Sequence, residues 1–594
     1  MNRIPVALAV SIGGLCCAVA GCSTRTDVSV TGNTPAQYSH LWITAQEVWF
    51  NTSATAAPED GGWVKFPLST PATVDLVTES GGNLGSLVTG LRLAPGTYAQ
   101  VRLIPVDAAA ALTTSAKTAG ALYNTEADYV DSAGTTHQLP LELLNPDKGI
   151  GIQGSLKVPV GNVGAALAAV STSSTTATTS TTTTPTTTAT TPTTSSSKTT
   201  TITSFAITFD GARDLTPFAY AAATAPNGIL LSSHAGAFDL SEVGGIQGQL
   251  TLTNLTGISS AAGLPTIQVS AESLSADGTR HVVVNRTAVH ADGSFLLYPL
   301  ATSSSSPADY DLVIHGPGIA TIIIKAVQVT LASSTSTATT TSTTAANATT
   351  IHSVSVGALI PRAASSYTAN LSTATGAALP AGAQVAFYQT LPTAGEVPYV
   401  IEASPIDPFN QVLANAQALS EGSVDSGTYS TSGAAVTLVS AAPAEGAGQY
   451  LVAASAPSFT DGTLTTTVSA PPAGTTTPVA VVVPGLTLAP GATSSSISAS
   501  VTQATAGKYD HGELLVTHDG TLVATTPLDA ALAQGAGATI TVRGLPAGTS
   551  AARYYVAVRA WNSRDATGTL QRQSYPTAID LRSAGTGAVQ LTIN

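Results

Sequence analysis

Apolar and polar residues alternate along much of the chain. Residues 98–104, 266–270 and 281–285 each place apolar side chains on one face and polar side chains on the other. This period of two is typical of half-buried β-strands. Tight-turn signals separate such runs, because Asp-Gly pairs accept the positive φ angles of hairpin turns, and they occur at Asp60, Asp210, Asp277, Asp292, Asp461 and Asp519.

Helical patterns are rare in comparison. The best lie at residues 407–420 and 528–534. Two apolar runs, at 319–324 and 479–483, are far shorter than the ~20 residues that span a membrane. We therefore interpret both runs as buried strands. Many short strands with frequent turns predict an all-β chain of tandem β-sandwich modules, either immunoglobulin-like or prealbumin-like.

Two low-complexity tracts interrupt the β pattern. Residues 171–204 are almost wholly Thr and Ser, and residues 333–350 are similar. Neither tract has large apolar side chains, so neither can offset the conformational entropy lost on ordering. We predict that both are disordered linkers. An O-glycosylated stalk and a bare spacer both agree with this composition.

The N-terminus has the pattern of an export signal. A short basic segment at residues 1–3 precedes an apolar stretch at 4–20. The segment Val-Ala-Gly-Cys-Ser at 19–23 then resembles the lipobox of bacterial lipoproteins. The resemblance implies cleavage between Gly21 and Cys22 and a diacylglycerol on the Cys22 thiol. An ordinary secretory signal with a chance cysteine is the alternative.

The cysteine content agrees with acylation. The chain has three cysteines, Cys16, Cys17 and Cys22. Cleavage would remove the first two, so the mature chain could form no internal disulfide, and acylation would account for its single thiol. Ser23, in the place of an Asp, implies by the same resemblance sorting to the outer membrane of a Gram-negative bacterium. The expected partner is therefore a membrane, reached through the lipid.

Charge excludes one class of partner. Charged residues make up 9% of the chain and the net charge is −13. Lys and Arg occur singly, with no basic stripe that could neutralise phosphates. Nucleic acid is therefore not an expected partner.

Six short segments between residues 38 and 250 carry a family resemblance. They are HLWITAQEVW at 40–49, GW at 62–63, VDL at 74–76, LAPGTYAQVR at 93–102, ITFDGAR at 207–213 and GGIQG at 244–248. Together they resemble the exported bacterial family called domain of unknown function 4382. The resemblance implies a β domain without an assigned activity, in which the first Ser/Thr tract is an insertion between neighbouring strands.

A second resemblance covers residues 244–331. Its segments are GQLTL at 248–252, ADGSFLL at 291–297 and YDLVI at 310–314. They resemble the prealbumin-like β-sandwich of carboxypeptidase regulatory-like and starch-binding-like modules, which implies a turn at Asp292 and a core role for Phe295.

These patterns divide the chain into consecutive parts. The predicted parts are a signal peptide at 1–21, a tether at 22–37, a β domain at 38–243 interrupted by the tract at 171–204, a sandwich at 244–332, a linker at 333–350, and further sandwiches at 351–478 and 479–594.

Motifs of catalysis are missing from the sequence. It contains no Gly-x-Ser-x-Gly, His-Glu-x-x-His, Walker or dinucleotide-binding motif, so we expect neither an enzyme nor a cofactor. The densest polar cluster lies at residues 509–519. His511 and Glu513 would share one face of a strand, and with His518 they are the candidate metal ligands. An exposed strand edge is the alternative interpretation.

Aromatic residues are the usual means of binding sugars. Trp42 and Trp49 are seven residues apart, so at most one should belong to the core face of a strand. Trp63 and Trp561 are the other candidates. The leading hypothesis is a non-catalytic, lipid-anchored envelope protein that presents modules for binding, adhesion or surface structure to an unidentified glycan or protein ligand. A glycan-binding protein is the alternative, and a hydrolase or metal-binding protein ranks below both.

Overall fold

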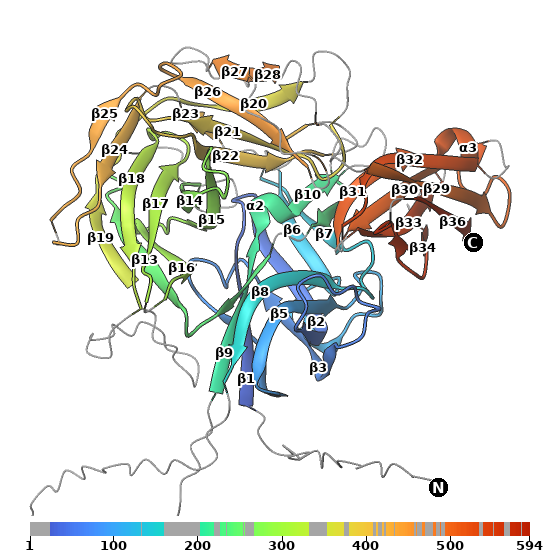
Figure 1. Ribbon diagram of the computed structural model, residues 1–594. Helices are drawn as coiled ribbons and strands as arrows, with labels where there is room; N and C mark the ends of the chain where they lie inside the picture. Colours follow the sequence, from blue (N-terminus) through green and yellow to red (C-terminus); the bar gives the residue numbers. More distant parts are fainter. Residues whose placement is uncertain are drawn as a thin grey trace, which may run out of the picture.

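The computed structural model shows an all-β protein (Figure 1). The structure describes residues 24–594 except 132–133, 160–201, 219–225, 233–234, 254, 256–265, 304, 332–352, 373–378, 408–411, 414–417, 421–422, 433, 457–458, 460–465, 470–478, 483–487, 489–493, 519, 534–537, 550–551, 563–570 and 584. Across these described residues the strands form seven sheets. The predicted all-β class is confirmed.

The N-terminal part is one sheet of 12 strands. The order is β10-β11-β7-β6-β2-β5-β8-β12-β9-β1-β4, and β3 also pairs with β2. Two short helices, α1 (Thr114–Ala119) and α2 (Gly211–Asp214), interrupt the strand succession. The strands are β1 Thr24–Asn33, β2 Tyr38–Asn51, β3 Val64–Asp75, β4 Gly85–Leu93, β5 Gly96–Pro105, β6 Thr125–Val130, β7 Thr136–Glu142, β8 Ile150–Val158, β9 Ile202–Asp210, β10 Leu215–Phe218, β11 Gly228–Leu231 and β12 Gly236–Asp239.

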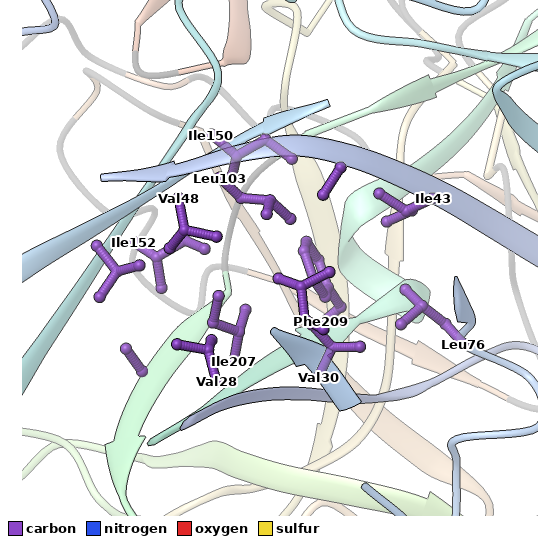
Figure 2. Packing of buried hydrophobic residues seen from close by; sticks show 14 of the residues in the cluster. Val28, Val30, Ile43, Val48, Leu76, Leu103, Ile150, Ile152, Ile207 and Phe209 are labelled. Carbon is purple, nitrogen blue, oxygen red and sulfur yellow. The ribbon is translucent and has the colours of Figure 1, made fainter. Parts of the chain in front are cut away.

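This sheet curls around a single core. Figure 2 shows Val28, Val48, Leu103, Ile152 and Ile207, from five different strands, packed together. Side chains from the far strands β4 and β11 join the same cluster. The alternation read from the sequence explains it, because every second residue of each strand points to the inside.

The first strand corrects the predicted tether at residues 22–37. Thr24–Asn33 is β1, which pairs in parallel with β9 and antiparallel with β4. The Thr24 hydroxyl donates to the Pro159 carbonyl at 2.7 Å, and that of Thr31 donates to the Glu79 carbonyl at 2.8 Å. Because these two hydroxyls are bonded, the burial of Thr24 and Thr31 costs little.

The predicted insertion falls between two strands of this sheet. Residues 160–201 connect β8 with β9, and β12 pairs with both of those strands. The predicted tract at 171–204 reaches into β9 at Ile202, which corrects its end. Its remainder, and the linker predicted at 333–350, lie outside the described residues.

The middle of the chain forms stacked sheets. Their orders are β16-β13-β19, β15-β14-β17-β18-β24-β25, β22-β21-β26-β27 and β23-β20-β28. The strands are β13 Val243–Leu250, β14 Gln268–Leu274, β15 His281–Ala288, β16 Ser294–Ala301, β17 Ala308–His315, β18 Ile322–Val329, β19 Ser353–Leu359, β20 Ser366–Ser372, β21 Gln384–Gln389, β22 Tyr399–Pro405, β23 Ala418–Ser420, β24 Val424–Thr428, β25 Val439–Ala441, β26 Gln449–Ser455, β27 Thr466–Ser469 and β28 Val479–Val482.

The sheets cross the predicted division between residues 332 and 351. β19 pairs with β13, and β24 pairs with β18, both in parallel. Backbone groups at the edges of the earlier sheets are thus satisfied by strands from the later part of the chain. The helix predicted at 407–420 is also wrong where it is described, since Ile406 bridges to Leu413 and Ala418–Ser420 is a strand.

The C-terminal lobe is a separate sandwich (Figure 1). Its sheets are β32-β29-β36 and β31-β30-β33-β34, with β35 also paired to β33, and they enclose their own core. The helix predicted at 528–534 is confirmed as α3 (Asp529–Ala533). The strands are β29 Ser494–Gln503, β30 His511–His518, β31 Thr521–Pro527, β32 Ala538–Pro546, β33 Arg553–Trp561, β34 Gln571–Ser574, β35 Ile579–Asp580 and β36 Thr586–Ile593.

Within the part of the chain that is described, no helix has the length and apolar character needed to cross a membrane.

Two turn glycines, one in the β14–β15 hairpin and one in the connection from β15 to β16, test the turns predicted from Asp-Gly pairs. Gly278 has φ 71° with open space around it, whereas a Cβ at Gly293 (φ 88°) would lie 2.0 Å from the Leu250 carbonyl oxygen. Gly278→Ala should cost about 1–2 kcal/mol of left-handed strain. Gly293→Ala should cost about 1–3 kcal/mol more, because β13 must move. Hydrogen exchange of β14 and β15 measures the first cost and that of β13 and β16 the second, and equal costs would contradict the clash.

Candidate functional site

The predicted acylation site precedes the first described strand. Gly21 and Cys22 lie outside the described residues, which begin at Thr24. The predicted cleavage and lipidation therefore stay predictions.

The three candidate metal ligands do not come together. The His511 Nδ1 atom lies 3.0 Å from Asp529 Oδ2, and its ring stacks on Trp561 at 5.6 Å. The His518 ring instead packs at 5.6 Å from Tyr554. Among the described residues, no group of three His, Cys, Asp or Glu side chains is arranged to hold a metal ion.

Glu513 belongs to a network that joins two lobes. Its Oε2 accepts hydrogen bonds from Arg559 Nη2 at 2.7 Å and Nε at 3.2 Å. Arg559 Nη1 also donates to Glu142 Oε2 at 3.1 Å, across to the N-terminal sheet. Arg572 Nη2 lies 2.6 Å from Glu142 Oε1. We call Glu142, Glu513, Arg559 and Arg572 the charge clasp.

Burial makes the charge clasp costly to break. Arg559 is 1% exposed and its guanidinium lies 4.5 Å from the centre of the Phe218 ring. Burial raises the pKa of Glu513, and the positive charge of Arg559 opposes that rise. A buried ion pair adds little net stability, but removal of one partner leaves a costly buried charge. The clasp therefore fixes how the C-terminal sandwich sits on the N-terminal sheet.

Further polar contacts extend this interface. Tyr555 donates to Glu59 Oε2 at 2.7 Å, and Arg553 pairs with Asp60 at 2.6 Å. Asn145 donates to the Thr517 hydroxyl at 2.8 Å. Sequence reasoning found only Glu513 among these residues, because the partners are hundreds of positions apart and follow no local pattern.

The tryptophans are mostly covered. A bulge between Ala45 and Glu47 shifts the alternation of β2, so Trp42 and Trp49 both lie on the face opposite the main core. Their spacing predicts at most one of them on the core face, and neither lies there. Trp42 (7% exposed) stacks on His40, and Trp49 (8% exposed) lies under Lys65. Trp63 and Trp561 are half-buried.

A second polar cluster was not foreseen from the sequence. Gln268 and Glu272 on β14, Arg286 on β15 and His315 on β17 are all buried, and with Glu402 of β22 we call them the buried polar layer. His315 Nδ1 lies 3.8 Å from Glu402 Oε2. Gln268, Arg286 and His315 alternate with core residues as ordinary strand positions do, which is why periodicity gave no signal.

Burial in the polar layer shifts the pKa values of Glu272 and His315 in opposite directions. Burial raises the pKa of Glu272 to about 8, although the Val400 N–H, the Ser270 hydroxyl and Arg286 oppose the rise. Burial, together with the charge of Arg286, lowers the pKa of His315 to about 3. Both side chains are therefore neutral at neutral pH. Arg286 carries the charge and lies 3.4 Å from Asp210 of the N-terminal sheet.

A comparison with known families bears on the N-terminal sheet. The family model described as "Domain of unknown function (DUF4382)" matches residues 23–216. Residues 23–216 form a DUF4382 domain. The match begins with β1, earlier than the residue 38 expected from sequence, and ends within β10. The DUF4382 domain thus contains residues 160–201 as an internal segment.

Other comparisons add little to this result. No curated protein matches the chain. The TIE protein of Bacillus anthracis is similar at 7% identity, covering 97% of this chain and 74% of that one, with a TM-score of 0.14. BcpA, the major pilin subunit of Bacillus cereus, shares 13% identity over 59% of this chain and 99% of that one (TM-score 0.12). The major pilin SpaA of Corynebacterium diphtheriae shares 10% over 59% and 100% (TM-score 0.12).

Glu272→Gln should alter how stability depends on pH. The raised pKa means that Glu272 favours the folded state below pH ~4.5 and loses that contribution as pH rises towards about 8. The loss is on the order of 4 kcal/mol for a fully buried group. The variant, always neutral, should match the wild type near pH 4.5 and exceed it above pH 8. Hydrogen exchange of β14 and β17 measures this, and parallel pH profiles would contradict it.

Glu142→Gln should loosen the C-terminal sandwich. The substitution leaves the buried Arg559 with one carboxylate in place of two, and loss of a buried charge partner costs about 3–5 kcal/mol. We expect the C-terminal sandwich to unfold in a separate, earlier calorimetric transition. Asp580→Asn is the control, because its pair with Arg582 is exposed and worth at most about 1 kcal/mol. Equal effects of the two substitutions would rule out the clasp.

Proposed function

We propose that this protein is a non-catalytic, lipid-anchored component of the bacterial cell envelope. The observation that carries the proposal is Cys22, placed within the lipobox-like segment 19–23 directly after the apolar stretch 4–20. A thiol is the group that accepts the diacylglycerol in such segments, and the mature chain would have no other cysteine. Ser23 favours the outer membrane as its destination.

The start of β1 supports an anchor close to the body. Thr24, the second residue after Cys22, already pairs with Leu93 of β4. Two residues span at most ~7 Å. An acylated Cys22 would therefore hold the DUF4382 domain directly on the membrane surface, without a long tether.

The use of ionisable groups supports a non-catalytic role. The buried charges of the clasp and of the buried polar layer pair across sheets and lobes. Such contacts orient modules with respect to one another. The proposed role is therefore to present a body of fixed shape, built from several β modules, for binding or for surface structure.

Glycan binding is less well supported. Trp42 and Trp49 are buried under neighbouring side chains, and a sugar needs an exposed ring face for stacking. Trp63 and Trp561, both half-buried, are the rings that such a ligand could reach.

The anchor is tested by intact mass spectrometry of the protein from its native envelope. We expect a chain that begins at Cys22 with added acyl mass, and loss of that mass in Cys22→Ala together with loss of normal processing. Cys17→Ala is the matched control, because Cys17 would leave with the signal peptide. An unmodified Cys22 in a chain released to the medium would rule out the anchored protein.

A further inference from the structure

The ends of several strands lie together at one end of the DUF4382 domain. Thr24 of β1 lies opposite Leu93 of β4, and Gly96 of β5 lies opposite Val158 of β8. Ile202, the first residue of β9, pairs with Arg25. Figure 1 shows β1 and β9 starting side by side at this end. We call it the anchor end, because Cys22 precedes Thr24 by two residues.

Basic side chains meet at the anchor end. Arg25 and Arg92 are directly opposite each other on β1 and β4, and both are exposed. The Arg25 side chain has no hydrogen-bond or ion-pair partner among the described residues. Gly90 leaves room for it, since a Cβ there would lie 3.1 Å from Arg25 Nη2. The Asp27 carboxylate of β1 accepts a hydrogen bond from the Gly90 N–H of β4 at 2.7 Å, so one carboxylate of the protein already lies beside this pair, and Arg92 takes part in an interaction within the protein.

This position is unusual in an acidic chain. The protein has 21 Lys and Arg against 34 Asp and Glu. Lys157, the third cation near the anchor end, already pairs with Glu242 at 2.6 Å. Arg25 is therefore the cation here that a ligand outside the protein can take as its partner, and the exposed Arg92 beside it adds a second positive charge.

We propose that the anchor end is a membrane-contact surface, in which Arg25 binds the phosphate of an anionic phospholipid headgroup and the exposed Arg92 adds positive charge beside it. The inference rests on the proposed anchor at Cys22, which would bring both arginines within about one Debye length, ~8 Å, of the bilayer. Guanidinium groups match phosphate oxygens with two parallel hydrogen bonds.

The proposed contact with the membrane is limited to the lipid headgroups. The exposed large apolar residues of the described chain lie elsewhere, at Val64, Leu122, Leu274, Val282, Ile360, Val412 and Val439. Among the described residues, no apolar wedge therefore enters the acyl region at the anchor end. Each arginine should favour the docked orientation about fivefold, the equivalent of about 1 kcal/mol near an anionic surface.

Energy transfer to labelled lipid tests the proposal on the acylated protein in vesicles. A dye on Thr97→Cys, an exposed position beside Gly96, acts as donor to acceptor headgroups. We expect stronger transfer in vesicles that contain phosphatidylglycerol than in vesicles of phosphatidylcholine alone. Arg25→Gln with Arg92→Gln, or raised salt, should return the transfer to the phosphatidylcholine value.

Arg582→Gln is the control, because this exposed arginine belongs to the C-terminal sandwich and pairs with Asp580. Transfer that is equal in both vesicles, or unchanged in the double variant, overturns the membrane contact. Vesicle flotation separates this failure from failure of the anchor. Protein that floats with vesicles but shows no charge-dependent transfer keeps its anchor and loses the contact, whereas protein that does not float and carries no acyl mass removes both.

Discussion

The guanidinium of Arg559 lies between carboxylates from two lobes, and the arrangement of those lobes depends on it. With 1% of the residue exposed, water cannot replace Glu142 or Glu513 as a partner. A displaced C-terminal sandwich would leave Glu142 without its two arginines. The small apolar cluster beside the clasp, which includes Leu144, adds contact area, but apolar contacts are not directional. The ion pairs of the clasp therefore determine how the two lobes are oriented.

Buried ionisable groups also lie at the junction between the middle of the chain and the N-terminal sheet, but two of them there are neutral. There Glu272 and His315 are kept neutral by burial, and Arg286 extends to Asp210 of the DUF4382 domain. Neutral groups can occupy a sheet interface without a counter-ion. The protein thus joins its parts by paired charges at both junctions, and the middle junction also contains a carboxyl group and an imidazole that burial keeps neutral.

Local patterns predicted local structure well, and long-range partners lay beyond them. Alternation at 98–104 and 281–285 identified β5 and β15, since strand periodicity depends on nearest neighbours. It missed β1, whose buried threonines look exposed in sequence. It also named Glu513 as a candidate metal ligand, because its hydrogen-bond partner, Arg559, lies 46 positions away on the neighbouring strand β33. A single bulge in β2 places Trp42 and Trp49 on the same face of the sheet, although their odd spacing predicts opposite faces.

The insertion between β8 and β9 has a consequence for how the gene can change. Its flanking residues are held by the sheet, with Pro159 bonded to Thr24 and Ile202 paired with Arg25. The entropy of closing a loop rises by only about 0.6 kcal/mol for each doubling of its length. Insertions or deletions within residues 160–201 should therefore leave the stability of the domain almost unchanged.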